Sequence, residues 1–120
     1  MKKIKEFRID ATQMPFVSEH LIIQDTGDVE VIKNTKVKLT KIGKKAQFFK
    51  ELDTALTLDF KMMTRYIQTP NYYHISIIFA DETEESHFYV DNLQANSQLS
   101  LKSVLMNYLD KDFLIKAVLD

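Results

Sequence analysis

The amino-terminal third of the chain alternates apolar and polar side chains with a period of two, which is the pattern of half-buried β-strands. In residues 4–11 the apolar positions are Phe7, Ile9 and Ala11. Residues 20–24 and 29–33 are two further apolar runs, and the polar stretch between them contains Gly27. Because a short glycine-containing link between two β-rich runs is typical of a hairpin, we predict one here.

The next segment, KVKLTKI, continues the same alternation. Val37 and Leu39 fall on one face of the predicted strand, and Lys36, Lys38 and Thr40 fall on the other. We therefore expect the two apolar side chains to contribute to the core. The lysines are expected to face solvent.

The period changes from two to 3.6 after Gly43. In residues 44–56, Phe49, Leu52 and Leu56 are spaced i, i+3, i+7, which predicts an amphipathic helix. Near the carboxyl terminus, apolar residues at i, i+3, i+4, i+7 and i+8 predict a second helix. These residues are Leu101, Val104, Leu105, Tyr108 and Leu109.

Three strands are predicted between the two helices, over residues 58–68, 72–80 and 86–90. The middle strand is dense in β-branched and aromatic residues, which favour strands. We expect the three to form a meander in which Ile77 lies opposite Val90. This register would bring the large apolar residues to one face of the sheet.

These elements predict a single α+β domain over residues 1–120. Its largely antiparallel sheet would have about seven strands, in the order ββββ-α-βββ-α(α). The same count of elements fits a pleckstrin-homology-like (PH-like) or open barrel with packed helices, which is the alternative arrangement. Residues 112–119 fit either a short helix capped by Asp112 or an edge strand, and we favour the helix.

Composition places the chain among ordinary globular proteins, with 45% hydrophobic and 28% charged residues and a formal net charge of -1. Cysteine is absent, which excludes disulfides and thiolate chemistry. The amino terminus, MKKIKEFRID, lacks the apolar run of a signal peptide, and no segment reaches the roughly 20 apolar residues that span a bilayer. We therefore expect a cytoplasmic protein without a membrane partner.

The first candidate site is basic, because residues 31–50 contain seven lysines and no acidic residue. Lys44 and Lys45 fall at the start of the predicted helix, where cations oppose the helix dipole and where an anion would be stabilised. The alternative is a solvated edge, on which lysines prevent aggregation of strands. The candidates for binding an anion or a nucleic acid are Lys36, Lys38, Lys41, Lys44 and Lys45.

The second candidate site is the face of the predicted meander that points away from its large apolar residues. It combines aromatic, methionine, arginine and histidine side chains, as protein interfaces do. The alternative is that one of the predicted helices covers this face and makes it part of the core. The interface candidates are Met63, Arg65, Tyr72, His74, His87 and Tyr89.

The sequence contains no pattern that indicates catalysis. The three histidines lack the spacing of metal ligands, and no nucleophile motif or phosphate-binding loop is found. We therefore expect no catalytic residue, no metal and no cofactor.

The predicted function is a non-enzymatic protein-binding module, such as a small adaptor, inhibitor or immunity-type protein, acting through a sheet face and a basic edge. The alternative is a regulatory protein that binds single-stranded nucleic acid through residues 33–50. The sequence does not specify the oligomeric state, and a homodimer is one alternative.

Overall fold

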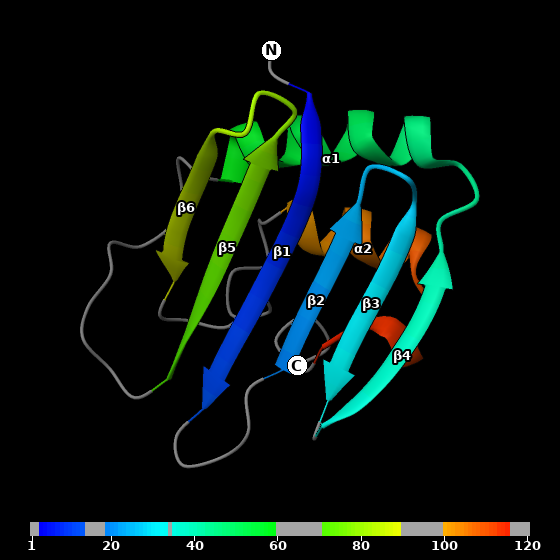
Figure 1. Cartoon of the computed structure of the whole chain (residues 1–120), viewed down its shortest axis with the longest axis vertical. Helices are drawn as coiled ribbons and strands as arrows, with labels where there is room; N and C mark the ends of the chain where they lie inside the picture. The colour runs from blue at the N-terminus through cyan, green and yellow to red at the C-terminus, as the bar shows by residue number, and fades with distance from the viewer. Residues whose placement is uncertain (1–2, 14–18, 34, 60–70, 90–99, 116–120) are drawn as a thin grey trace.

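The computed structural model describes residues 3–13, 19–33, 35–59, 71–89 and 100–115, and it confirms an α+β architecture. Six strands form one antiparallel sheet in the order β4-β3-β2-β1-β5-β6 (Figure 1). The strands are β1 (Ile4–Gln13), β2 (Glu19–Gln24), β3 (Asp28–Lys33), β4 (Lys36–Lys41), β5 (Asn71–Phe79) and β6 (Glu84–Tyr89). The helices are α1 (Lys45–Asp59), α2 (Ser100–Tyr108) and the 3-10 helix η2 (Lys111–Phe113).

The described strands form an open sheet that does not close into a barrel, so the structure has the predicted α+β class without the barrel of the PH-like alternative. Its two edges among the described strands are β4 and β6, which lie on opposite sides of the molecule (Figure 1). The structure describes six strands, one fewer than the seven that the sequence predicts. The predicted strand over residues 58–68 begins inside α1, and the rest of it lies outside the described residues.

The central strand β1 connects the two halves of the sheet. Phe7 and Ile9 are fully buried on one face, as the alternation in the sequence predicts. Ile9 lies opposite Leu21 of β2 on one side and opposite Ile75 of β5 on the other. Both neighbours are also fully buried. This shared face is the strand side of the hydrophobic core.

Both predicted helices form, and they pack on this core face of the sheet (Figure 1). Phe48 and Leu52 of α1 and Leu101 and Leu105 of α2 are fully buried, because each pair is spaced to fall on one side of its helix. The Phe48 ring lies edge-on to Tyr108 of α2, with ring centroids 5.2 Å apart. The opposite face of the sheet, which we call the outer face, carries neither helix.

The predicted β2–β3 hairpin is confirmed, and its glycine has a clear role. Gly27 has a φ of +91°, and its N–H donates to the C=O of Gln24 at 2.9 Å. A side chain at this position would place Cβ 3.2 Å from the carbonyl oxygen of Ile42. Ile42 follows β4, and its N–H donates to the C=O of Gly27 at 2.8 Å. The hydrogen bond between Ile42 and the β2–β3 turn thus holds the end of β4 against the sheet.

The orientation of β4 is the reverse of the one that the sequence predicts. Lys38 lies opposite the buried Val31, which places the lysine on the core side of the sheet. Val37 and Leu39 fall on the outer face and are 53% and 72% exposed. Ile42 explains the reversal, because it is buried and has the same parity as Lys38. Either Ile42 or the pair Val37 and Leu39 can face the core, because they lie on opposite faces of the strand. In the structure it is Ile42 that is buried.

The register of β5 and β6 also differs from the prediction. Ile77 lies opposite Glu85 and not opposite Val90. The turn is shorter than expected: Phe79 N–H donates to the C=O of Thr83 at 2.9 Å, and Glu82 takes a left-handed φ of 68°. The register shifts by an odd number of residues, so the strand β6 exchanges its two faces.

Of the carboxyl-terminal segment predicted as a capped helix or an edge strand, residues 112–115 are described, and the rest of it lies outside the described residues. A short 3-10 helix spans Lys111–Phe113, so Asp112 lies within it and does not cap it. The preceding residue, Asp110, makes no side-chain cap hydrogen bond. Leu114 and Ile115 then enter the core as buried side chains. Among the described residues, none of the helices has the length and apolar character needed to cross a membrane.

The reversed orientation of β4 predicts unequal effects for one substitution made at two sites. Leu21→Ala removes a fully buried side chain and should lower the free energy of unfolding by about 2–5 kcal/mol. Leu39→Ala removes a side chain that is 72% exposed and should change it by no more than about 0.5 kcal/mol. Urea unfolding measures both values. Equal losses would contradict the outward orientation of Leu39.

Candidate functional site

The edge strand β4 exposes backbone groups that can pair with another strand. In an antiparallel ladder, residues alternate between those that bond to the neighbouring strand and those whose N–H and C=O point away. Ile42 bonds to Gly27 at the end of the ladder. Because bonded residues alternate along the strand, the even-numbered residues of β4 form the backbone hydrogen bonds with β3. Val37, Leu39 and Lys41 therefore direct their backbone groups to the outside of the sheet.

The outer face beside this edge carries four aliphatic side chains among polar ones. Val37 lies opposite Ile32 of β3, and Leu39 lies two positions further along β4 on the same face. Ile22 of β2 lies in the same row as Leu39, with Glu30 between them. A shallow hollow of about 250 Å³ lies beside Leu39, Glu30 and Ile22 and extends towards Gln24 and Asp28. We call Ile22, Ile32, Val37 and Leu39 the β4 patch.

The five lysines predicted as an anion site do not share one surface. Lys36 and Lys38 lie on the core side of β4, and both are exposed. Lys41 lies on the outer face, with its Nζ 3.6 Å from Asp28 Oδ1. Lys36 and Lys38 form no ion pair with any residue that the structure describes. Two charges of one sign therefore remain without a counterion beside the β4 edge.

Lys44 and Lys45 lie at the start of α1, as predicted, and both are exposed. The carbonyl of Lys44 accepts the hydrogen bond from Phe48 N–H at 2.9 Å and so begins the helix. The stem of Lys45 packs on the β2–β3 turn, since a Cβ at Gly27 would lie 3.6 Å from Lys45 Cβ. This packing gives Lys45 a structural reason for its position, without an anion at the helix terminus.

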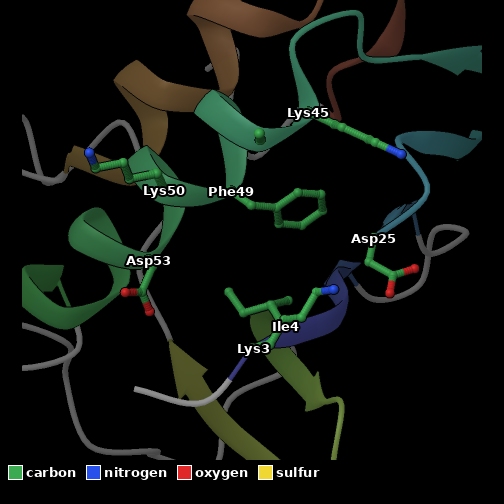
Figure 2. Close-up of a pocket in the computed structure, with 8 residues that line it drawn as sticks. Lys3, Ile4, Asp25, Lys45, Phe49, Lys50 and Asp53 are labelled. Atoms are coloured by element: carbon green, nitrogen blue, oxygen red, sulfur yellow. The ribbon is translucent and has the colours of Figure 1, made fainter.

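A cavity of about 440 Å³ opens between the first turns of α1 and the start of β1 (Figure 2). Its apolar wall is made by Ile4, Ala46 and Phe49. The rim carries both signs of charge, from Lys3, Lys45, Lys50, Asp25 and Asp53. Figure 2 shows Lys45 extending over Asp25 and Lys50 lying on the same side as Asp53. Because the carboxylates reduce the positive potential, this cavity is a weak site for an anion.

The middle of the outer face carries a polar cluster. Asp10 of β1 accepts hydrogen bonds from Arg8 Nε at 2.9 and 3.0 Å and contacts His20 Nδ1 of β2. On β5, His74 lies opposite Asp10, and its Nε2 is 3.4 Å from the hydroxyl of Ser76. The carboxylate of Asp10 thus has two side-chain partners, Arg8 and His20. Because the side chains of this cluster interact with one another within the sheet, a structural role is favoured.

The predicted interface residues do not form one face. His74 and Tyr72 share the outer-face parity of β5, whereas the register pairs His87 with Ile75 and Tyr89 with Tyr73. Positions 87 and 89 of β6 therefore belong to the core side of the sheet. The odd shift of the β5–β6 register causes this separation. Met63 and Arg65 lie outside the described residues.

Within the described part of the chain, no three histidine, aspartate or glutamate side chains come together as a metal site would require. Comparison of the chain with known protein families, with curated proteins and with solved structures finds no match in any of the three. Function is therefore argued from the geometry of the site alone.

The sequence contains the β4 patch but does not indicate that it is exposed. Alternation in KVKLTKI is equally regular for either orientation of the strand. One signal was available in Ile42, which has the opposite parity to Val37 and Leu39 and directly precedes Gly43. Only one of the two apolar sets can face the core, and the lysines are typical of an edge strand.

A contact between the helices gives a spectroscopic test of the structure near Lys44. The Tyr108 hydroxyl donates to the Glu51 carboxylate, and both line a hollow with Lys44. The hydrogen bond to Glu51, with some desolvation, raises the pKa of Tyr108 to about 12.

We expect Glu51→Gln to bring the pKa of Tyr108 back towards the ordinary value near 10. Because the pKa is higher in the folded state, this bond stabilises the fold below about pH 10 and loses its effect as the pH rises through about 12. Titration of the Tyr108 ring carbon by NMR measures the change. An unchanged pKa in Glu51→Gln would contradict the bond.

Proposed function

We propose that the protein is a non-enzymatic protein-binding module and that its β4 edge accepts an extended, acidic strand from a partner. The observation that carries the proposal is the outward orientation of Val37 and Leu39 on an edge strand. The same strand carries Lys36 and Lys38, which form no ion pair within the described part of the chain. Such an edge offers backbone hydrogen bonds, apolar contacts and positive charge along one line. Addition of a strand to an exposed sheet edge is a common mode of peptide recognition.

Protection of the edge alone does not account for β4. Lysines on an edge strand discourage strand pairing because they must be desolvated. Exposed aliphatic side chains have the opposite effect, and an edge that only needed protection would carry polar residues at these positions. Leu39 exposes 72% of its surface and Val37 exposes 53%. Burying them against a partner is favourable by about 25 cal/mol for each Å² of apolar surface removed from water.

The two faces of β4 specify a pattern in the strand that would pair with it. Side chains of an added strand alternate between the faces of the sheet, and cross-strand neighbours interact directly. On the outer face the partner would meet Val37 and Leu39, and on the core side it would meet Lys36 and Lys38. The matching strand therefore alternates apolar and acidic residues.

Single-stranded nucleic acid is a weaker candidate for the same edge. Glu30 lies between Ile22 and Leu39 on the outer face, and Asp28 lies beside Lys41. A phosphate backbone that followed the strand would carry a charge at every nucleotide beside these carboxylates, whereas an added strand can keep its acids on the core side, opposite Lys36 and Lys38. The described part of the β4 patch is aliphatic, whereas binding of single strands depends on stacking of bases on aromatic rings.

The proposal includes a cytoplasmic location and excludes catalysis. The chain has no cysteine, so neither its fold nor its interface needs an oxidising compartment. The polar groups on the outer face are engaged with one another, as Asp10 is with Arg8 and His20. A binding edge without a reactive group fits an adaptor or inhibitor.

A peptide that alternates glutamate and valine tests the proposal directly. Fluorescence anisotropy of the labelled peptide at low salt should show saturable binding to the wild-type chain. Leu39→Pro removes an N–H that points away from β3, so it should weaken binding by about tenfold without breaking the internal ladder. Lys36→Gln combined with Lys38→Gln should also weaken binding and reduce its dependence on salt.

The matched control is Ser86→Pro, which makes the same change on the other edge strand and should leave peptide binding intact. Circular dichroism checks that both proline variants stay folded. Equal binding by Leu39→Pro and the wild type would overturn the use of the β4 edge. An oligothymidine that binds more tightly than the peptide, and that is lost in the lysine variant alone, would favour nucleic acid instead.

A further inference from the structure

We infer that the strand accepted by β4 is β6 of a second copy of the chain, so that copies associate head to tail in one continuous antiparallel sheet. The inference rests on the proposed function of the β4 edge and names its partner. The structure supports it because β4 and β6 are the two edges of the same described sheet (Figure 1).

Strand directions are compatible with this contact. All neighbouring strands in the described sheet are antiparallel, and five such pairings separate β4 from β6. The arrows of β4 and β6 therefore run in opposite directions (Figure 1). A second copy placed beside the first in the same orientation brings its β6 antiparallel to β4. Each strand is six residues long, so the two edges match in length.

The backbone groups of the two edges are also in phase. Phe79 N–H donates to the C=O of Thr83, which makes this pair a hydrogen-bonded one. Every second residue from Thr83 onward therefore forms backbone hydrogen bonds with β5. The residues between them, Glu84 and Ser86, direct their N–H and C=O groups away from β5. On β4 the outward groups belong to Val37, Leu39 and Lys41. Both sets lie on the outer face, so full pairing keeps the outer faces of the two copies on one side.

The charges of the two edges are complementary at the end where β4 finishes and β6 begins. β4 carries three lysines and no acid, whereas β6 begins with Glu84 and Glu85. In the full-length antiparallel register, Glu84 lies opposite Lys41, which also pairs with Asp28, and Glu85 lies opposite Thr40. Leu39 and Lys38 lie opposite Ser86 and His87, so the acids of β6 meet only one end of β4. Glu84, Glu85 and Ser86 are exposed. Opposite charges at directly facing positions stabilise a strand pair.

Symmetric pairing of like edges is less favourable on the same grounds. Two β4 strands would bring three lysines from each copy together, and two β6 strands would bring two glutamates from each copy together. Like charges gathered at one interface repel each other even where they are not directly opposite. A head-to-tail contact leaves one β4 and one β6 open at the ends, so association continues past the dimer unless a ring closes.

A charge exchange tests the contact between copies. In sedimentation velocity at low salt, the wild type should form larger species as its concentration rises. Lys41→Glu alone and Glu84→Lys alone should each weaken this association by about tenfold, because each creates a like-charge pair. An equimolar mixture of the two variants should recover association, since every contact between unlike copies is again of opposite charge.

Two proline variants examine the same contact through the backbone. Leu39→Pro and Ser86→Pro remove outward N–H groups from opposite edges, and either one should reduce self-association. A mixture of Lys41→Glu and Glu84→Lys that stays as dissociated as each variant would overturn the inference. So would an assembly that Glu84→Lys leaves unchanged, because that result indicates a contact that does not use β6.

The outcomes for the two proposals are separable. A wild-type chain that binds the alternating peptide and stays monomeric at all concentrations would retain the proposed function and overturn self-assembly. Peptide binding that competes with assembly, with both lost in Leu39→Pro, would support the two together. A chain that neither binds the peptide nor associates would overturn both.

Discussion

The structure depends on the burial of one face of the sheet beneath two helices. Phe7 and Ile9 of the central strand are fully buried, and Leu21 and Ile75 extend this surface to the strands on either side. Successive side chains of a strand point to opposite faces, so every strand that gives one set of residues to this core must display the other set on the outer face. The composition of the outer face is therefore a consequence of the core.

The same constraint acts on the edge strand through a single residue. Ile42 is buried beside the β2–β3 turn, and its hydrogen bond to Gly27 holds it in register with β3. With that parity fixed, Val37 and Leu39 must face outward, although each is apolar. The edge strand therefore has apolar side chains on its outer face and lysines on its core side. The proposed binding mode follows from this arrangement.

The parts of the fold that local sequence could predict are those set by a strong period. Both helices form where apolar residues recur every three or four positions, and the β2–β3 hairpin forms where Gly27 allows a positive φ. The β5–β6 turn could not be predicted in the same way, because Glu82 takes the left-handed conformation without a glycine to announce it. That one turn moved His87 and Tyr89 away from the face expected for them.

By itself, the sequence determined the fold class, the helices, the buried residues of the central strand and the concentration of lysines in residues 31–50. Each of these follows from side-chain chemistry repeated over a short span. Tertiary structure alone decided that β1 lies between β2 and β5, and that Val37 and Leu39 face outward. A strand pattern has two equivalent orientations, and only packing against distant elements such as α1 and the Gly27 turn selects between them.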